Sequence, residues 1–289
     1  MIKRALFGLL GAVALSTTLG QAQASDDRKV ILGTNNWAEN VAVANMWKLL
    51  LDTRGYDVEL KSIGKSVLFA GLATRDIDVT LELWLPTTDA PFLAPYDDDI
   101  EVHDIWYRGT GLGLVVPSYV DIDSIADLKG REDEFAYKGR PTVLGIDAGS
   151  AIAALTDDAI DRYELDMKQV NSSEPAMMSA LSDAYSRQAP MLVTLWNPHW
   201  AFAQYDLKYL KDPEGVYGDN EDIYWMSRLA FGEDFPKITQ VLNAWEMSDE
   251  ELATLMAGIE SRGDPVEGAQ AWIDEHPAQI ERWLTAGGL

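Results

Sequence analysis

The chain has 289 residues, of which 47% are hydrophobic and 24% are charged, so it is a globular protein with room for two α/β lobes of about 100–150 residues each. Its net charge of −24 argues against nucleic-acid binding, because phosphate contacts need a basic surface. Since it contains no cysteine, disulfides, thiolate metal sites, a cysteine nucleophile and a lipid-modified cysteine anchor are all excluded.

Residues 1–24 have the features of a cleaved secretory signal. Lys3 and Arg4 form a charged start, residues 5–15 are apolar, and Ala22 and Ala24 form a small-residue cleavage site. The apolar segment is short for a bilayer span, which needs about 20 residues. We therefore expect the mature chain to be released into the periplasm without a lipid anchor.

Strands and helices alternate in the first part of the mature chain. Apolar runs predict strands at residues 30–32, 58–63 and 77–83, with helices at 39–54 and 66–74 between them. This alternation predicts a parallel sheet. The proline-containing segment 84–97 predicts an irregular loop.

A second unit begins at Pro117 and repeats the alternation. Strands are expected at residues 143–147 and 191–196 and helices at 150–163 and 174–187, and the polar segment 209–217 predicts a return crossing to a last strand at 223–228. We therefore assign lobe 1 to residues 25–116 and 217–289, and lobe 2 to 117–216.

The glycine-rich segment 109–113 precedes a strand and not a helix, so it does not predict a dinucleotide-binding turn. Its glycines instead predict a close approach of the backbone to another group.

Three tryptophans stand where predicted strands end. Trp84 and Trp196 each close an apolar run and precede a proline by two residues, and Trp37 follows the first strand. Ligands of α/β sheets bind beyond the carboxyl ends of the strands, so the three residues are candidates for one site. From the pattern alone, a role as ordinary core aromatics is equally open, whereas Trp245, Trp272 and Trp283 lie within predicted helices and are assigned to packing.

Indole faces attract cations, and a quaternary ammonium group suits them because it makes no demand for hydrogen bonds. Each contact contributes roughly 0.5–2 kcal/mol, while micromolar affinity needs about 8 kcal/mol. The helix that opens at Gly149 and Ser150 offers free N–H groups for a ligand carboxylate. An ordinary strand-to-helix turn is the alternative interpretation.

The sequence carries no pattern of a catalytic centre. The three histidines are far apart and lack zinc-type spacing, and there is no Gly-x-Ser-x-Gly segment. A carboxylate pair is not excluded, although no spacing singles one out. His199, between Pro198 and Trp200, is interpreted as an orienting or structural residue. We expect no enzyme activity and no cofactor.

The chain resembles the substrate-binding proteins of ABC importers for glycine betaine, choline and related compatible solutes. The segments that carry the resemblance are residues 36–45, 76–79, 83–87, 113–120, 145–150 and 195–202. Together they extend over nearly the whole mature chain.

The resemblance implies an α/β fold of the type II periplasmic-binding-protein class, a two-lobed clamp with a hinge between the lobes. It implies a monomer that delivers a small onium ligand to a permease and ATPase complex in the inner membrane. It further implies that Trp37, Trp84 and Trp196 form an aromatic cage, and that a ligand carboxylate meets backbone N–H groups at Ala151 and Ile152.

Three positions bear on the identity of the ligand. Asp89 occupies a position of polar contact in some members, where an acid would repel a carboxylate. Choline-preferring relatives add a cage tyrosine where this chain has Gly111 and Leu112, yet they carry an acid at the position of Glu39. We favour glycine betaine or a similar carboxylated onium such as dimethylsulfoniopropionate or carnitine. Choline is the alternative, and a sugar-binding or sensory module and an enzyme on the same scaffold are the rival classes.

Overall fold

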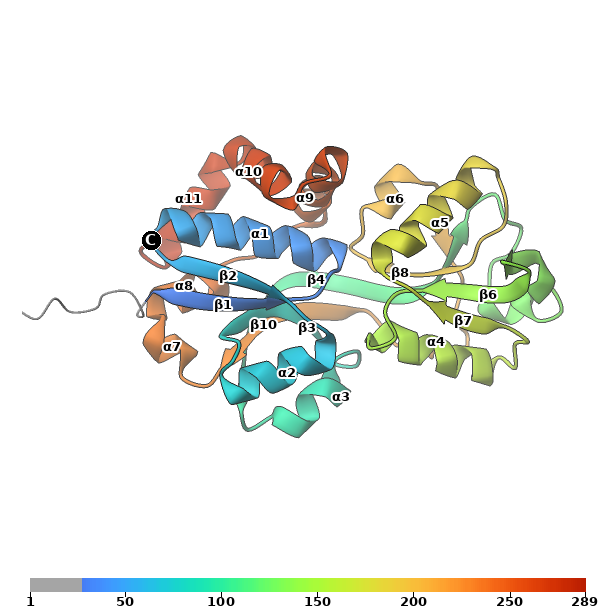
Figure 1. Cartoon of the computed structure of the whole chain (residues 1–289), viewed down its shortest axis with the longest axis horizontal. Helices are drawn as coiled ribbons and strands as arrows, with labels where there is room; N and C mark the ends of the chain where they lie inside the picture. The colour runs from blue at the N-terminus through green and yellow to red at the C-terminus, as the bar shows by residue number, and fades with distance from the viewer. Residues whose placement is uncertain (1–27) are drawn as a thin grey trace, which may run out of the picture.

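The computed structural model describes residues 28–289, and the expected signal segment 1–24 lies outside them. Figure 1 shows two groups of helices and strands side by side, with strand β4 (Ile100–Pro117) running from one group into the other. The path of this strand decides how the two groups are joined.

The first group is built on a five-stranded sheet in the order β2-β1-β3-β10-β4. Its other strands are β1 (Lys29–Thr34), β2 (Asp57–Ser62), β3 (Val79–Leu85) and β10 (Glu221–Arg228). Strands β1, β2 and β3 are parallel, as predicted, but β10 is antiparallel to both β3 and β4. The parallel pairing predicted for the first three strands is therefore confirmed, and the sheet as a whole is mixed because β10 enters from the second group in the opposite direction.

Helices cover both faces of this sheet (Figure 1). On one face lie α1 (Ala38–Thr53), α9 (Asp249–Arg262), α10 (Pro265–Glu275) and α11 (Pro277–Ala286); on the other lie α2 (Lys65–Thr74) and α3 (Ala90–Leu93). The short helices α7 (Phe231–Asp234) and α8 (Pro236–Asn243) lie at the far end. Helix α3 and the 3-10 turn Ala94–Tyr96 replace the irregular loop expected after Trp84.

The second group continues the same sheet in the order β4-β8-β6-β5, with β7 paired to β6 and β9 paired to β4. Its strands are β5 (Ala136–Tyr137), β6 (Arg140–Gly145), β7 (Lys168–Asn171), β8 (Val193–Asn197) and β9 (Leu207–Tyr209). Its helices are α4 (Ala151–Arg162), α5 (Glu174–Ser186) and α6 (Ala201–Gln204), with two 3-10 turns at Ile125–Leu128 and Glu132–Phe135.

Strand β4 changes partner between the two groups. It pairs with β10 up to Thr110 and with β8 from Gly111 onward. Gly109 has a φ of +78°, which a residue with a side chain rarely adopts. A Cβ atom on Gly113 would lie 3.0 Å from the ring of Tyr209, so the predicted close approach is confirmed there. The glycine-rich segment lies inside one long strand and is no turn.

Tryptophans also build the core of the first group. Trp106 stacks on Trp245 with ring centroids 4.5 Å apart, and Trp47 meets Trp245 edge-on at 5.4 Å. Trp272 and Trp283 stack at 6.3 Å. Trp245, Trp272 and Trp283 are all buried, which confirms their assignment to packing.

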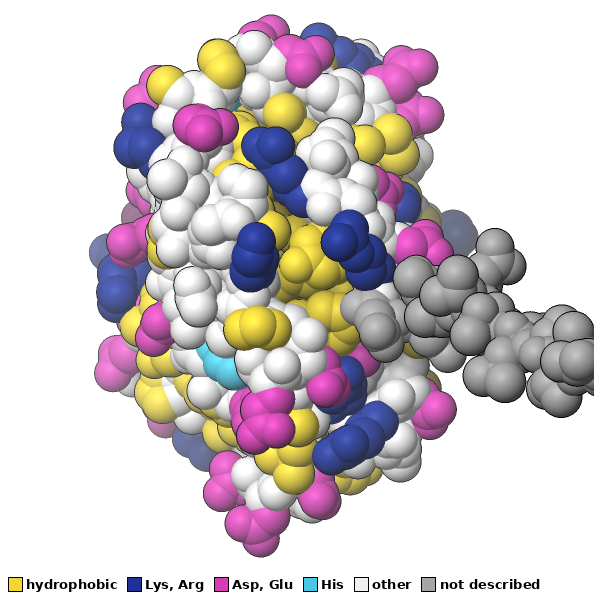
Figure 2. Space-filling model, turned by 90° about the vertical axis from the view of Figure 1, so that its left-hand side faces the viewer, with side chains coloured by type: hydrophobic (Ala, Val, Ile, Leu, Met, Phe, Trp, Pro, Cys, Tyr) yellow, Lys and Arg dark blue, Asp and Glu magenta, His cyan; other side chains and the backbone are white. Residues whose placement is uncertain are grey.

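One end of the molecule carries charges of both signs. Figure 2 shows this end of the first group, where lysine and arginine side chains stand among acidic ones around an apolar strip. This face is therefore not a concentrated acidic surface.

Candidate ligand-binding site

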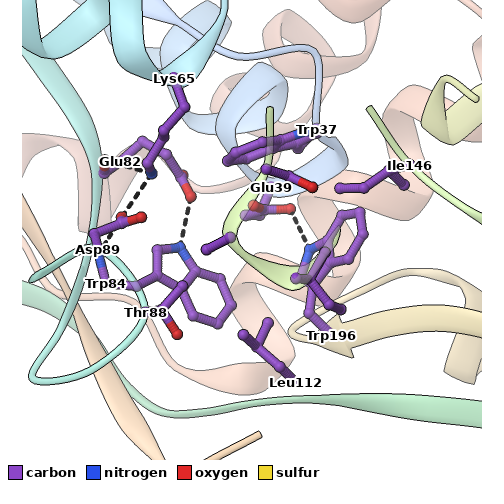
Figure 3. Close-up of a pocket in the computed structure, with 13 residues that line it drawn as sticks. Trp37, Glu39, Lys65, Glu82, Trp84, Thr88, Asp89, Leu112, Ile146 and Trp196 are labelled. Carbon is purple, nitrogen blue, oxygen red and sulfur yellow. Dashed lines mark hydrogen bonds and ion pairs between the residues drawn. The ribbon is translucent and has the colours of Figure 1, made fainter. Parts of the chain in front are cut away.

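A cavity lies between the two groups, beyond the carboxyl ends of the parallel strands. The space between the side chains that line it, part of which is open to solvent, is about 340 Å³. The residues that line it are Trp37, Glu39, Lys65, Glu82, Trp84, Thr88, Asp89, Leu112, Ile146, Ser150, Ala151, Ile152 and Trp196. Figure 3 shows how these side chains face one another.

The three strand-end tryptophans meet at this cavity. Trp37 follows β1 and is the N-cap residue of α1, Trp84 is the last residue but one of β3, and Trp196 is the last but one of β8. Strands β3 and β8 thus run one residue past their tryptophans. Trp84 and Trp196 are buried and Trp37 is partly exposed. The rings lie on three sides of the cavity in Figure 3.

Each of these indole N–H groups donates to a carboxyl group. Trp84 Nε1 donates to Glu82 Oε1 at 2.5 Å, and Trp196 Nε1 donates to Glu39 Oε2 at 2.7 Å. Trp37 Nε1 donates to Asp147 Oδ2 at 3.0 Å. Because the N–H edge of each ring is held in this way, the orientation of its π face is held as well.

A buried ion pair closes one side of the cavity. Lys65 Nζ lies 2.6 Å from Asp89 Oδ2, and both side chains are 1% exposed. The same Asp89 oxygen accepts from the backbone N–H of Trp84 at 2.8 Å. Lys65 Nζ also lies 5.1 Å from the ring centroid of Trp37. Asp89 therefore lines the cavity as expected, but a neighbouring ammonium group offsets its charge.

Glu39 and Glu82 are fully buried, and their environments disfavour ionisation. Burial raises the pKa of Glu82 to about 7, a rise that the Lys65 ammonium opposes and the Asp89 charge adds to. Burial, followed by the charges of Glu82 and Glu174, holds the pKa of Glu39 well above its ordinary value. Both carboxyl groups therefore gain a proton more readily than an exposed glutamate.

The start of helix α4 forms the opposite wall. Ser150 is its N-cap residue, and Ser150 Oγ accepts from the N–H of Ala153 at 3.3 Å. The first N–H groups of a helix have no intrahelical partner, and here they belong to Ala151 and Ile152 at the cavity wall. Gly149, which was expected to contribute, is not among the lining residues.

His199 does not line the cavity either, but lies directly behind it. Its ring meets that of Trp196 edge-on with centroids 4.8 Å apart. His199 Nε2 lies 3.1 Å from Glu174 Oε1, and Glu174 Oε2 accepts from the backbone N–H of Ala38 at 2.8 Å. Because Ala38 begins α1 and Glu174 begins α5, this chain of contacts joins the two groups of elements. The position of His199 is that of an orienting residue.

Sequence reasoning missed several residues of the site: Lys65, Glu82, Thr88, Ile146, Asp147 and Glu174. One of them left a signal, since Glu82 interrupts an otherwise apolar strand. A buried acid within a core strand requires a partner or a function. Leu112 also lines the cavity.

Within residues 28–289, no group of three or more His, Asp or Glu side chains is arranged to hold a metal ion. No helix among the described residues combines the length and apolarity needed to cross a membrane.

A mixed α/β fold of two joined groups, with a tryptophan-walled cavity between them, defines the class of substrate-binding proteins. The chain belongs to the OpuAC family, the substrate binding domain of the ABC-type glycine betaine transport system, whose model matches residues 28–275. This family serves transport and is not a class of enzymes.

Individual relatives agree with this membership. The glycine betaine/carnitine transport binding protein GbuC of Listeria monocytogenes is 39% identical over 145 residues, which cover 49% of this chain and 48% of that protein. The match thus spans about half the length of this relative.

Two solved structures share the fold over most of their length. Lactococcal OpuAC in its closed conformation with glycine betaine has a TM-score of 0.81 and 30% identity, covering 89% of this chain and 99% of that one. An ABC-transporter choline binding protein in complex with choline has a TM-score of 0.80 and 26% identity, covering 89% and 91%.

Proposed function

We propose that this chain is a periplasmic binding protein that captures a small onium osmolyte in the cavity and delivers it to the membrane complex of an ABC importer. The observation that carries the proposal is the convergence of Trp37, Trp84 and Trp196 on one cavity, each with its N–H edge held by a carboxyl group. Lys65 Nζ already lies over the ring of Trp37, and the sides of the three rings that face the cavity suit a cation without hydrogen-bond donors.

The tryptophan cage gives enough binding free energy for micromolar affinity only if a second group in the site also binds the ligand. Three indole faces contribute roughly 2–6 kcal/mol in a desolvated site. Micromolar binding needs about 8 kcal/mol, so a further contribution is required. The N–H groups of Ala151 and Ile152 at the start of α4 supply it by binding a ligand carboxylate. This arrangement favours glycine betaine or a similar carboxylated onium, such as carnitine or dimethylsulfoniopropionate.

Choline is the second candidate, and specific residues favour it. Glu39 and Glu82 lie in the cavity wall, and each has a carboxyl oxygen without a hydrogen-bond partner among the described residues. These oxygens suit the positive charge and the hydroxyl of choline. Leu112 argues the other way, because it offers no ring at the position of the extra cage tyrosine.

Closure of the two groups over the ligand is the proposed mechanism of capture, with no covalent step. Glu39 to Trp196, Trp37 to Asp147 and Ala38 to Glu174 are hydrogen bonds between the groups. They form when the groups approach, and closure removes water from the cage, which strengthens its electrostatic interactions. The closed form is then the state that the importer receives.

The test is a titration of intrinsic tryptophan fluorescence in mature protein with glycine betaine, choline, carnitine and dimethylsulfoniopropionate. We expect a saturable change at micromolar concentration with at least one of them, confirmed by calorimetry. A flat response to all four, combined with binding of neutral sugars, would assign the protein to the sugar-binding class. Turnover of any of the four compounds would assign it to the enzymes.

A further inference from the structure

The cavity wall contains more negative charge than its one basic group can offset. Glu39, Glu82 and Asp89 are each at most 1% exposed. Among the described residues that line the cavity, Lys65 is the one basic side chain, and its ammonium group is paired with Asp89 at 2.6 Å. Glu39 and Glu82 therefore have no cation of their own.

Each of these two glutamates also has one oxygen left over. Glu82 Oε1 and Glu39 Oε2 accept the indole N–H groups of Trp84 and Trp196. Glu82 Oε2 and Glu39 Oε1 are buried without a hydrogen-bond partner in the part of the chain that the structure describes. A buried carboxylate oxygen without a partner is costly, so either a proton or a ligand has to satisfy it.

We propose that Glu82, together with Glu39, determines which onium ligands the site retains. With both carboxyl groups ionised, the site holds cations that carry no carboxylate, of which choline is the type. With both protonated, it holds zwitterions that carry one, of which glycine betaine is the type. This inference rests on the proposed function, because it assumes that an onium group enters the tryptophan cage.

The balance of charges in the cavity explains why the ionisation of Glu39 and Glu82 would switch the preferred ligand. Lys65 and Asp89 offset each other, so two ionised glutamates place an uncompensated charge of about −2 beside the cage, which attracts a cation and repels a carboxylate. When protonated, Glu39 and Glu82 are neutral, so they no longer repel a ligand carboxylate that is bound by the N–H groups at the start of α4. A cation that enters the protonated site expels a proton, since the ammonium charge favours ionised carboxyl groups.

The groups that face Glu82 place its ionisation near neutral pH, and the groups that face Glu39 raise its pKa as well. Burial raises the pKa of Glu82 to about 7, with Lys65 lowering it and Asp89 raising it. Burial is also the main cause of the raised pKa of Glu39, and the charges of Glu82 and Glu174 add to it. Two more groups act indirectly on Glu39 and Glu82, through their neighbours. The ring of His199 contacts Glu174, and the charge of Glu221 acts on Asp89.

The experiment measures the affinity of wild-type protein for choline and for glycine betaine by calorimetry from pH 5.5 to 8.5. We expect choline affinity to rise with pH by up to about tenfold per pH unit for each proton released, and glycine betaine affinity to fall over the same range. In buffers of different ionisation enthalpy at pH 7, choline binding should release protons and glycine betaine binding should not. The number of protons released on binding is measured on the wild-type protein alone.

The variant Glu82→Gln tests whether Glu82 is the source of the released protons. A glutamine keeps an oxygen for the N–H of Trp84 but has no proton to lose, so the variant should release fewer protons with choline and show a flatter pH profile. Glu250→Gln is the matched control, because it removes one charge from an exposed position on α9. It should keep the wild-type profile for both ligands.

The outcomes separate the two proposals. If both ligands bind with parallel pH profiles, or if Glu82→Gln keeps the full proton release, the proposed role of Glu82 and Glu39 in ligand selection is refuted. The proposed tryptophan cage is not affected by that result. If neither ligand binds at any pH, the proposed function and the proposed role of the two glutamates are both refuted. If the affinities for choline and glycine betaine change in opposite directions with pH, and Glu82→Gln flattens both profiles, the role of Glu82 in ligand selection is established.

Discussion

Trp196 Nε1 donates a hydrogen bond of 2.7 Å to Glu39 Oε2, and this bond links the two groups of elements through the cavity itself. Trp196 belongs to β8 in the second group, and Glu39 lies in the first turn of α1 in the first. One contact thus orients an indole face and joins the two groups. In the proposed mechanism of capture, this contact couples ligand binding to closure.

Removing a cage ring should weaken binding strongly. We expect Trp84→Ala and Trp196→Ala each to lower affinity for the preferred onium ligand at least tenfold, because each removes a desolvated cation–π contact. Both variants should remain folded. Fluorescence and calorimetric titrations measure the loss, and circular dichroism checks the fold.

A matched control for the rings is available in the core. Trp272 Nε1 donates to Thr254 Oγ1 at 3.0 Å, away from the cavity. Trp272→Phe and Trp196→Phe therefore remove the same atoms and a comparable hydrogen bond. Only Trp196→Phe should change ligand affinity; equal effects of the two substitutions would contradict the cage.

Glu174 should govern closure without touching the ligand. Glu174→Ala removes the acceptor for the N–H of Ala38 and the partner of His199, so the closed form loses two contacts. We expect affinity to fall about tenfold, which corresponds to about 1.4 kcal/mol, mainly through faster ligand dissociation. Stopped-flow fluorescence measures the rate, and small-angle scattering of the ligand-free variant should show a larger radius of gyration. An unchanged dissociation rate would remove Glu174 from the mechanism.

The stability of the ligand-free protein should depend on Glu82 in a pH-dependent way. The pKa of Glu82 is about 7 in the folded protein and about 4.3 in an unfolded chain. Between these values the folded state binds the extra proton, so the free energy of unfolding falls as the pH rises, by about 1.4 kcal/mol for each pKa unit of difference.

Glu82→Gln should therefore be more stable than wild type at pH 8 and lose that advantage toward pH 4. Thermal unfolding across this range provides the measurement, with a shift of about 2–4 °C per kcal/mol for proteins near this size. Glu250→Gln, at an exposed position, should follow the wild-type curve. A constant offset between wild type and Glu82→Gln would contradict the assigned pKa.

The ion pair of Lys65 and Asp89 should be strongly cooperative. Lys65→Met leaves a buried carboxylate uncompensated and should destabilise the protein by about 3–5 kcal/mol. Lys65→Met combined with Asp89→Asn should recover much of the loss, because no unpaired charge remains. Urea unfolding of the two single variants and the double variant gives the coupling energy, and additive effects would show that the pair is not coupled.

Replacing Gly109 should change the rates of ligand binding and release as well as the stability of the folded protein. Gly109 and Gly139 have φ values of +78° and +80° with open space where a Cβ atom would lie. Alanine at either position should cost about 1–2 kcal/mol of stability. Gly109 precedes the point where β4 passes between the groups, whereas Gly139 lies in the β5–β6 turn, so only Gly109→Ala should change the rates of ligand binding and release.

Much of the fold could be predicted from the sequence, because helices and strands leave patterns among residues that are neighbours along the chain. Apolar runs and glycine or proline breaks placed β1, α1, β2 and α2 within about two residues of their observed bounds. The long strand β4 was recognised only in its last part. Its first half contains charged side chains and mostly half-buried or exposed residues, so no apolar run marks it.

The antiparallel pairing of β10 was missed for a different reason. Strand direction within a sheet depends on where the chain re-enters it, and the return from the second group brings β10 in opposite to β3. No property of residues 221–228 alone encodes that direction.

What the sequence by itself determined is the set of aromatic residues at the strand ends and the family to which the chain belongs, since both depend on neighbouring residues along the chain. What only the tertiary structure decided is the electrostatics of the cavity. Trp37 meets Asp147 across 110 residues and Glu39 meets Trp196 across 157, so these pairs exist only in the folded chain. The burial that raises the pKa of Glu82, and the ammonium group that offsets Asp89, likewise arise only when distant segments exclude water from one cavity.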